Sequence, residues 1–90
     1  MDTAEAKAVL GQLKHGRVRR WFGLGARAEE LFDTFAKINE LGDWCGEFGR
    51  LAQRFEGSAD AAADKQVKVA TYLSAATYYH IGDWISAKLH

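Results

Sequence analysis

The chain has 90 residues, of which 48% are hydrophobic and 27% are charged, and this composition excludes an intrinsically disordered protein. Twelve acidic and twelve basic residues cancel, so the net charge predicts neither nucleic-acid binding nor membrane binding. Proline is absent, and Ala, Leu, Glu, Lys and Arg are frequent, which favours helices throughout. We therefore expect one all-α domain over residues 1–90, a compact bundle of four to five helices.

Cysteine content and the N-terminal segment indicate the cellular compartment. Cys45 is the only cysteine, so no internal disulfide can form, which suits a reducing cytoplasm. The N-terminal segment is acidic and lacks the apolar core of a signal peptide. No run approaches the roughly 18 apolar residues of a membrane span. We expect a cytoplasmic location, and we expect Cys45 to be a small buried residue rather than a nucleophile.

The first half of the chain is expected to hold two helices. Apolar residues at helical spacing predict the first over residues 3–14. A second, over residues 26–41, has one apolar stripe, and its acidic residues precede its lysine, as the helix dipole favours. Gly42 then suits a C-terminal cap, and Asp43 suits the next N-terminal cap.

These helices are connected by a basic segment, residues 15–27, which is interleaved with aromatic residues and glycines. Arg17, Arg19 and Arg20 precede Trp21 and Phe22 in it, and these three arginines are the candidate anion-binding residues. Three interpretations are open: an arm that binds phosphate, a membrane-surface patch, or a solvated connector anchored by its aromatic residues. No nucleic-acid fold motif accompanies the cluster, so the connector is favoured and nucleic acid is not the expected partner.

The second half of the chain is expected to form two long helices and a short last one. Their expected bounds are residues 44–56, 59–81 and 84–89. Gly57 is expected to end the first of them, with Ser58 or Asp60 starting the next. Gly82 is expected to interrupt the chain before the short last helix.

The helix expected over residues 59–81 is apolar or aromatic around most of its girth. On a helical wheel one face carries Ala62, Gln66, Val69, Leu73, Ala76, Thr77 and His80. We expect this to be the core face, with His80 either a core histidine or a ligand contact. Tyr72 and Tyr79 lie along one flank, and Tyr78 points away from the core stripe. Such a helix is normally covered on more than one side, so part of it, including Tyr78, is expected to meet a partner or a ligand.

Known catalytic and metal-binding motifs are missing from the sequence. There is no G-x-S-x-G elbow, no Walker loop, no H-E-x-x-H and no pair of cysteines. Asp60 and Asp64 are four residues apart, but the Glu-x-x-His repeats of di-metal bundles do not accompany them. We assign no catalytic residue, and we expect no metal ion and no cofactor.

The later half of the chain, roughly Leu41 to Asp83, resembles a known family. The residues that carry the resemblance are Trp44, Leu51, Ala52, Phe55, Gln66, Ala70, Tyr72, Leu73 and the string Ala75-Ala76-Thr77-Tyr78-Tyr79-His80. They are similar to the N-terminal helical segment of the α/β-hydrolases related to fermentation-respiration switch protein and to 2,6-dihydropseudooxynicotine hydrolase. In that group a helical region covers the active site of the hydrolase core. The core cleaves carbon–carbon bonds next to a ketone, or esters, with a Ser-His-Asp triad, whose residues would all lie beyond His90.

The resemblance implies a helical lid or substrate-pocket module of a serine α/β-hydrolase, with the hydrolase core as its partner. The candidate pocket or partner-contact residues are Tyr72, Tyr78, Tyr79, His80 and Trp44. The alternative is a non-enzymatic interaction module, a small dimer that buries the aromatic flank of its last helix against a second copy of itself. A third hypothesis is a nucleic-acid or membrane-surface binder that uses the basic segment.

Overall fold

The structure is a computed structural model that describes residues 2–89, with side chains as far as residue 85 in the last helix. Residues 1 and 90, the ends of the expected domain, lie outside it. Within the described residues there are five α-helices and no strand, which confirms the predicted all-α class and helical bundle. The helices are α1 (Thr3–Gly11), α2 (Val18–Gly23), α3 (Ala28–Lys37), α4 (Trp44–Ala61) and α5 (Lys65–Leu89).

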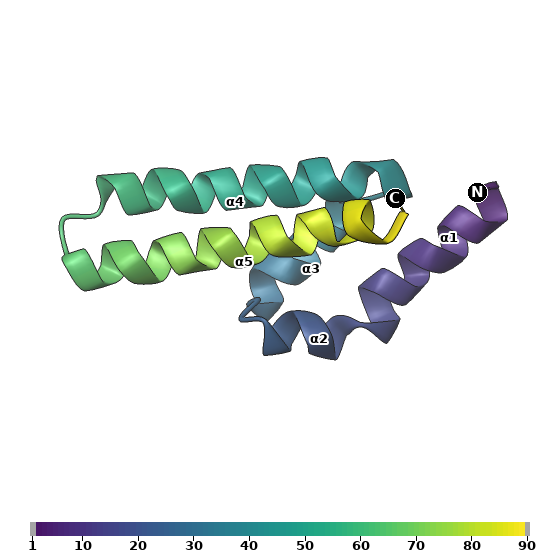
Figure 1. The fold of residues 1–90 in the computed structure, drawn as a ribbon, viewed down its shortest axis with the longest axis horizontal. Helices are drawn as coiled ribbons and strands as arrows, with labels where there is room; N and C mark the ends of the chain where they lie inside the picture. Colours follow the sequence, from purple (N-terminus) through teal and green to yellow (C-terminus); the bar gives the residue numbers. More distant parts are fainter. Residues whose placement is uncertain (1, 90) are drawn as a thin grey trace.

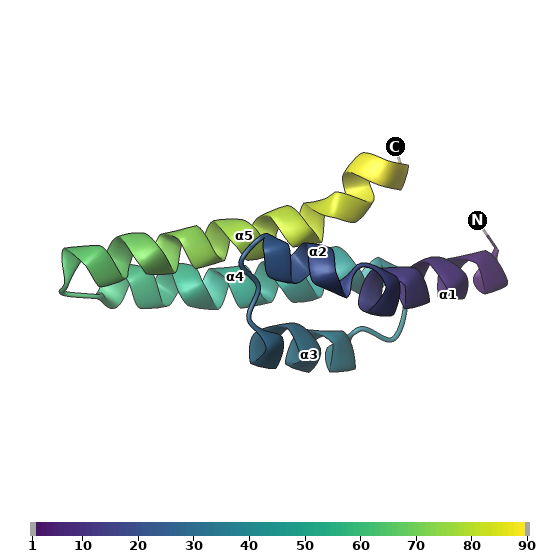
Figure 2. The ribbon, with the colours of Figure 1, turned by 90° about the horizontal axis from the view of Figure 1, so that it is seen from below.

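The two longest helices, α4 and α5, form an antiparallel hairpin along the longest dimension of the molecule (Figure 1). The described chain measures 47 × 23 × 21 Å, so it is elongated along this hairpin. Helices α1, α2 and α3 gather at the end where α4 begins, whereas the hairpin turn projects beyond them. Seen from below, α5, α4 and α3 lie one above another, with α5 as an outer layer (Figure 2).

The core lies at the covered end of the hairpin and consists largely of rings. The rings of Trp44 and Phe48 on α4 have centroids 4.8 Å apart. Phe35 of α3 lies 5.7 Å from Trp44, and Trp21 of α2 lies 6.0 Å from it. Large aromatic side chains bury the most apolar area per residue, so these four rings hold α2, α3 and α4 together.

Each buried indole N–H has a backbone acceptor. Trp21 Nε1 donates to the oxygen of Leu13 at 2.8 Å, and Trp44 Nε1 donates to the oxygen of Ile81 at 2.9 Å. Both tryptophans are fully buried, so an unpaired N–H in either place would cost about 1–3 kcal/mol. The bonds fix α2 to the preceding turn and α4 to the later part of α5.

The basic segment contains more helix than expected. Helix α1 ends at Gly11, a π-helical turn spans Gln12–Gly16, and α2 spans Val18–Gly23. Trp21, at the centre of α2, is the residue that anchors this segment in the core.

Helix α3 ends at Lys37, earlier than predicted, so Gly42 does not cap it. Ile38 takes an extended conformation and is buried in the core. A 3-10 turn at Leu41–Asp43 follows, in which the Asp43 carboxylate accepts hydrogen bonds from the backbone nitrogens of Asn39 and Glu40. Burial of Ile38 decides where this helix stops.

Helix α4 continues through Gly57 to Ala61, so the predicted break at Gly57 is wrong. A glycine inside a helix costs only about 1 kcal/mol relative to alanine. Contact with α5 outweighs this cost, because Ala59, beyond the glycine, is fully buried in the described structure.

The start of α5 is also later than predicted. Asp64 provides the cap, since its Oδ1 accepts from the backbone nitrogens of Gln66 and Val67 at 2.8 and 3.0 Å. The predicted caps Ser58 and Asp60 lie inside α4 instead.

Gly82 lies within α5, which runs on to Leu89, so the predicted separate helix over residues 84–89 is wrong. Gly82 is buried, and a Cβ there would lie 3.1 Å from the Cβ of Phe48. This glycine therefore lets α4 and α5 approach closely instead of ending a helix.

Helix α5 turns toward the core the side opposite to the one predicted. Ala75, Tyr78 and Ile81 are at most 2% exposed, whereas Val69 and Leu73, on the predicted core face, are 52% and 64% exposed. His80 of the predicted core face is exposed as well. The prediction failed because both sides of α5 are apolar, so the pattern of α5 does not show which side packs against the other helices.

Tyr78 lies in the core, so the prediction that it points away from the core and meets a partner is wrong. Its ring lies between Phe55 and Phe48, with centroid distances of 5.3 and 6.5 Å. Its hydroxyl oxygen accepts a hydrogen bond from the backbone nitrogen of Arg27 at 3.1 Å. Tyrosine suits this position for two reasons. Its ring fills the space between the two phenylalanine rings, and its hydroxyl pairs with a backbone N–H.

Candidate functional site

One side of α5 is uncovered from Lys65 to Asp83 in the described structure. We call it the outer face of α5, and its exposed residues are Lys65, Val69, Tyr72, Leu73, Ala76, His80 and Asp83. Successive residues of an α-helix turn by about 100°, which places all of them within an arc of about 100°. They form a continuous strip rather than scattered exposed positions.

The centre of the outer face is apolar. Leu73 and Val69 are more than half exposed, and Tyr72 is 40% exposed. Full burial of a valine or leucine side chain is worth roughly 1.5–3 kcal/mol. A protein surface that covers this strip would therefore gain binding energy from it.

The connection between α2 and α3 borders the outer face. The Thr77 hydroxyl of α5 donates to the backbone oxygen of Leu24 at 3.2 Å, and Leu24 is itself 39% exposed. Two further exposed rings, Phe22 and Phe32, lie nearby in the chain with centroids 6.2 Å apart. Leu24 is therefore a partly exposed apolar residue next to the strip.

The predicted pocket residues lie in three different surroundings. Trp44 and Tyr78 are in the core, and Tyr79 lies beside α4, where its hydroxyl meets a carboxylate. Tyr72 is on the outer face, and its hydroxyl reaches a carboxylate of α4. His80 lies on the outer face. The structure thus does not gather these side chains around one cavity.

The two flanking tyrosines link α5 to α4. The Tyr72 hydroxyl donates a hydrogen bond to the Asp60 carboxylate, and this bond raises the pKa of Tyr72 above its ordinary value. A hydrogen bond with Glu56 raises the pKa of Tyr79 in the same direction. Asp60 and Glu56 were not among the predicted site residues, although their spacing of four places them on one side of α4.

Two of the candidate anion-binding arginines lie against Trp84. The guanidinium carbon of Arg20 is 4.6 Å from the centroid of the Trp84 ring, and that of Arg17 is 6.0 Å away. His80 completes the group, with its ring edge-on to Trp84 at 6.3 Å. Arg19 is exposed on α2. Anion binding by these arginines stays a prediction, and the importance of Trp84 could not be read from the sequence, since it depends on where α2 packs.

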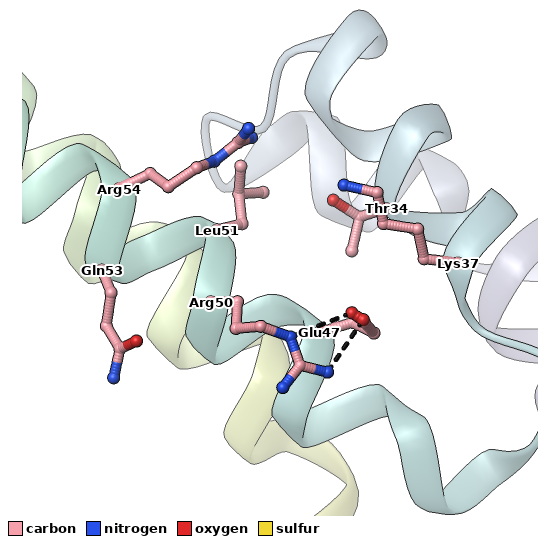
Figure 3. A pocket seen from close by; sticks show the side chains of 7 residues that line it. All are labelled: Thr34, Lys37, Glu47, Arg50, Leu51, Gln53 and Arg54. Carbon is pink, nitrogen blue, oxygen red and sulfur yellow. Dashed lines mark hydrogen bonds and ion pairs between the residues drawn. The ribbon is translucent and has the colours of Figure 1, made fainter.

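A cleft of about 450 Å³ lies between α3 and α4. Its lining consists of Thr34, Lys37, Glu47, Arg50, Leu51, Gln53 and Arg54. In Figure 3 the side chain of Arg50 turns toward Glu47, and dashed lines mark the contacts between them. None of the predicted site residues lines this cleft.

The charges of this cleft are partly paired. Arg50 Nε and Nη2 donate to the two oxygens of Glu47 at 3.1 and 2.9 Å. These hydrogen bonds hold the pKa of the Glu47 carboxyl below its ordinary value. Arg50 is the exposed member of this pair, whereas the Glu47 side chain is only 13% exposed.

A metal-binding cluster or a reactive thiol would be another kind of candidate site. Among residues 2–89, no cluster of three His, Cys, Asp or Glu side chains could hold a metal ion. Cys45 is exposed, so the prediction that it is buried is wrong. The preceding residue, Trp44, takes the core side of α4, and one residue further the helix has turned by about 100°. In the same part of the chain, no helix combines the length and apolar character needed to cross a membrane.

Comparison with known proteins gives no matching family model, no similar curated protein and no similar solved structure. The resemblance to hydrolase-associated helical segments therefore stays a prediction. The outer face of α5 is the candidate functional site with the clearest physical basis, because it is long, continuous and apolar at its centre.

Proposed function

We propose that this chain is a helical interaction module whose outer face of α5 is covered by another protein surface. The observation that supports this function is the exposure of Val69 and Leu73 on a helix whose opposite side fills the core. A helix that is apolar on two sides is normally covered on both. Extended exposed apolar surface of this kind marks sites of protein–protein contact.

The shape of the outer face favours contact with a surface over binding of a small molecule. It is one side of a helix, and the cleft between α3 and α4 is lined by other residues. Its central side chains offer apolar contact, with charged or titratable groups at Lys65, His80 and Asp83. Such a strip fits the groove or helix of a partner protein.

The family resemblance gives this function a second form, in which the covering surface is a hydrolase core and the chain is its lid. His80 favours this form, since its exposed imidazole lies on the face that would meet the core. A pocket role for Tyr72 would require its hydrogen bond to the Asp60 carboxylate to open.

Site-specific photo-crosslinking tests the proposed function. A photoreactive amino acid replaces Leu73 on the outer face or, as a matched control, Gln53, an exposed residue of α4. We expect a defined adduct from position 73, in the cells that encode the chain, and none from position 53. Equal yields from the two positions, or no adduct from position 73, would refute the function.

The identity of the adduct separates the two forms. An adduct with a protein that carries a G-x-S-x-G nucleophile motif would support the lid. An adduct with a second copy of the chain would support a self-associating module. It would exclude a hydrolase core as the surface that covers this face.

A further inference from the structure

The two ends of the outer face of α5 carry opposite charges on the same side of the helix. Lys65 is the first residue of α5 and Asp83 lies near its end, 18 residues later. This spacing equals five turns of about 3.6 residues, so both side chains project in the same direction. At a rise of about 1.5 Å per residue they are roughly 27 Å apart. Both are exposed in the described structure.

This arrangement is complementary to itself when one copy is reversed. A two-fold axis at residue 74, midway between the charges, brings Lys65 of one copy opposite Asp83 of the other, and the same contact forms a second time. A parallel arrangement would instead place like charges together at both ends. Opposite charges across a contact select orientation and register more than they add affinity.

The apolar centre is compatible with the same axis. Tyr72 and Ala76 are each two residues from position 74, so the ring of one copy lies opposite the small side chain of the other. A large residue opposite a small one allows two helices to approach closely. Leu73 is next to the axis, so the two leucines, each 64% exposed in the single chain, would meet near the centre.

We infer that the outer face of α5 binds a second copy of this chain in antiparallel orientation. This rests on the proposed function, because it names the partner of the same face. The neighbouring elements leave room for it. Helix α4 lies on the other side of α5, and the connection between α2 and α3 borders one edge, where Thr77 donates to Leu24.

A charge-exchange experiment on the full chain tests this inference. The variants are Lys65→Glu, Asp83→Lys and an equimolar mixture of the two. Both positions are exposed, and Lys65→Glu places an acid in the first turn of α5, which the helix dipole favours, so we expect both variants to fold. Sedimentation equilibrium at low and high salt gives the dimer dissociation constant of each sample.

We expect the unaltered chain to dimerise and each single variant to dimerise about three- to tenfold more weakly at low salt, because two attractive contacts become repulsive. The mixture restores both attractive contacts, so the heterodimer should be preferred over either homodimer. High salt should remove this preference. As a further check, Leu73→Asp should abolish the dimer, whereas Gln53→Asp should leave it intact.

Two results would overturn the inference. One is an unaltered chain that stays monomeric at every concentration, and the other is a mixture that shows no preference for the heterodimer. Neither removes the proposed function if position 73 still crosslinks to a different, identified protein. Failure of the crosslink at position 73 would remove both.

Discussion

The two sides of helix α5 have similar apolar character but different surroundings. On the inner side, Ala75, Tyr78 and Ile81 are almost completely buried within the chain. On the outer side, Val69 and Leu73 are more than half exposed. Apolar residues at helical spacing show that a side of a helix can be buried, but they do not show which surface buries it.

The inner side is distinguished by how closely its residues fit particular neighbours. Tyr78 lies between two rings and accepts the backbone N–H of Arg27. Gly82 allows α5 to approach Phe48 of α4. On the outer side, Val69 and Leu73 stay more than half exposed in the described structure, which leaves this side available to another molecule.

The largest expected difference between the two sides is the loss of stability when a large apolar side chain is truncated. Ile81→Ala should lower the free energy of unfolding by about 2–5 kcal/mol, because Ile81 is fully buried. Leu73→Ala should change it by no more than about 0.5 kcal/mol in the monomer. Urea unfolding at a concentration where the chain is monomeric measures both. Equal losses would mean that Leu73 is also a core residue.

A second pair of variants compares glycines inside the two long helices. Gly57→Ala should raise the free energy of unfolding by about 0.5–1 kcal/mol, since nothing lies within 4 Å of the added methyl group. Gly82→Ala should lower it by about 1 kcal/mol, because the methyl group would press on the Phe48 Cβ, which cannot rotate away from its own backbone. Thermal unfolding of the two variants side by side checks the opposite signs. Stabilisation by both would mean that the helices are not closely packed at Gly82.

A third pair compares tyrosine hydroxyls. Tyr78→Phe should cost about 1 kcal/mol, because the backbone N–H of Arg27 loses its acceptor in a partly buried place. Tyr72→Phe should have almost no effect, since its hydrogen bond to Asp60 is exposed. Chemical denaturation of each variant against the unaltered chain is the measurement. A larger loss from the Tyr72 variant would contradict the assignment of inner and outer sides.

The smallest expected effect is on tyrosine ionisation. Asp60→Ala should return the pKa of Tyr72 toward its ordinary value of 10.0, because the hydrogen bond to the carboxylate is what raises it. The pKa of Tyr78 should stay raised, since burial causes its shift. The Tyr72–Asp60 contribution to stability is therefore present below pH 10 and lost as the pH rises through the raised pKa. Site-resolved tyrosine titration by NMR distinguishes the two residues, and an unchanged Tyr72 would show that Asp60 is not its partner.

Much of the fold could be predicted from the sequence. The all-α class followed from the lack of proline and from helical spacing, and Trp44 was placed correctly on the apolar side of its helix, where it is fully buried. The helix ends could not be predicted as well. A glycine inside a helix costs about 1 kcal/mol, so tertiary contact with the neighbouring helix decided that α4 passes Gly57 and that α5 passes Gly82.

The candidate site could be predicted only in part. Val69, Leu73 and His80 were recognised as one side of the last helix, but the sequence placed that side inside. A helical wheel of α5 is apolar on two sides, and only the structure shows which side packs against the aromatic rings of α4. The contact of Arg20 with Trp84 likewise depends on the packing of α2 beside α5.

Thiol reactivity at two positions of α5 tests the central claim most directly, namely that one side of this helix is core and the other is the contact with a second copy. Leu73→Cys and Ala75→Cys are compared in a Cys45→Ser chain, because Cys45 is itself exposed. We expect the thiol at position 75 to react slowly at every protein concentration. The thiol at position 73 should react quickly in the monomer and become protected as the concentration passes the dimer dissociation constant. Slow reaction at position 73 in the monomer, or fast reaction at every concentration, would contradict this account.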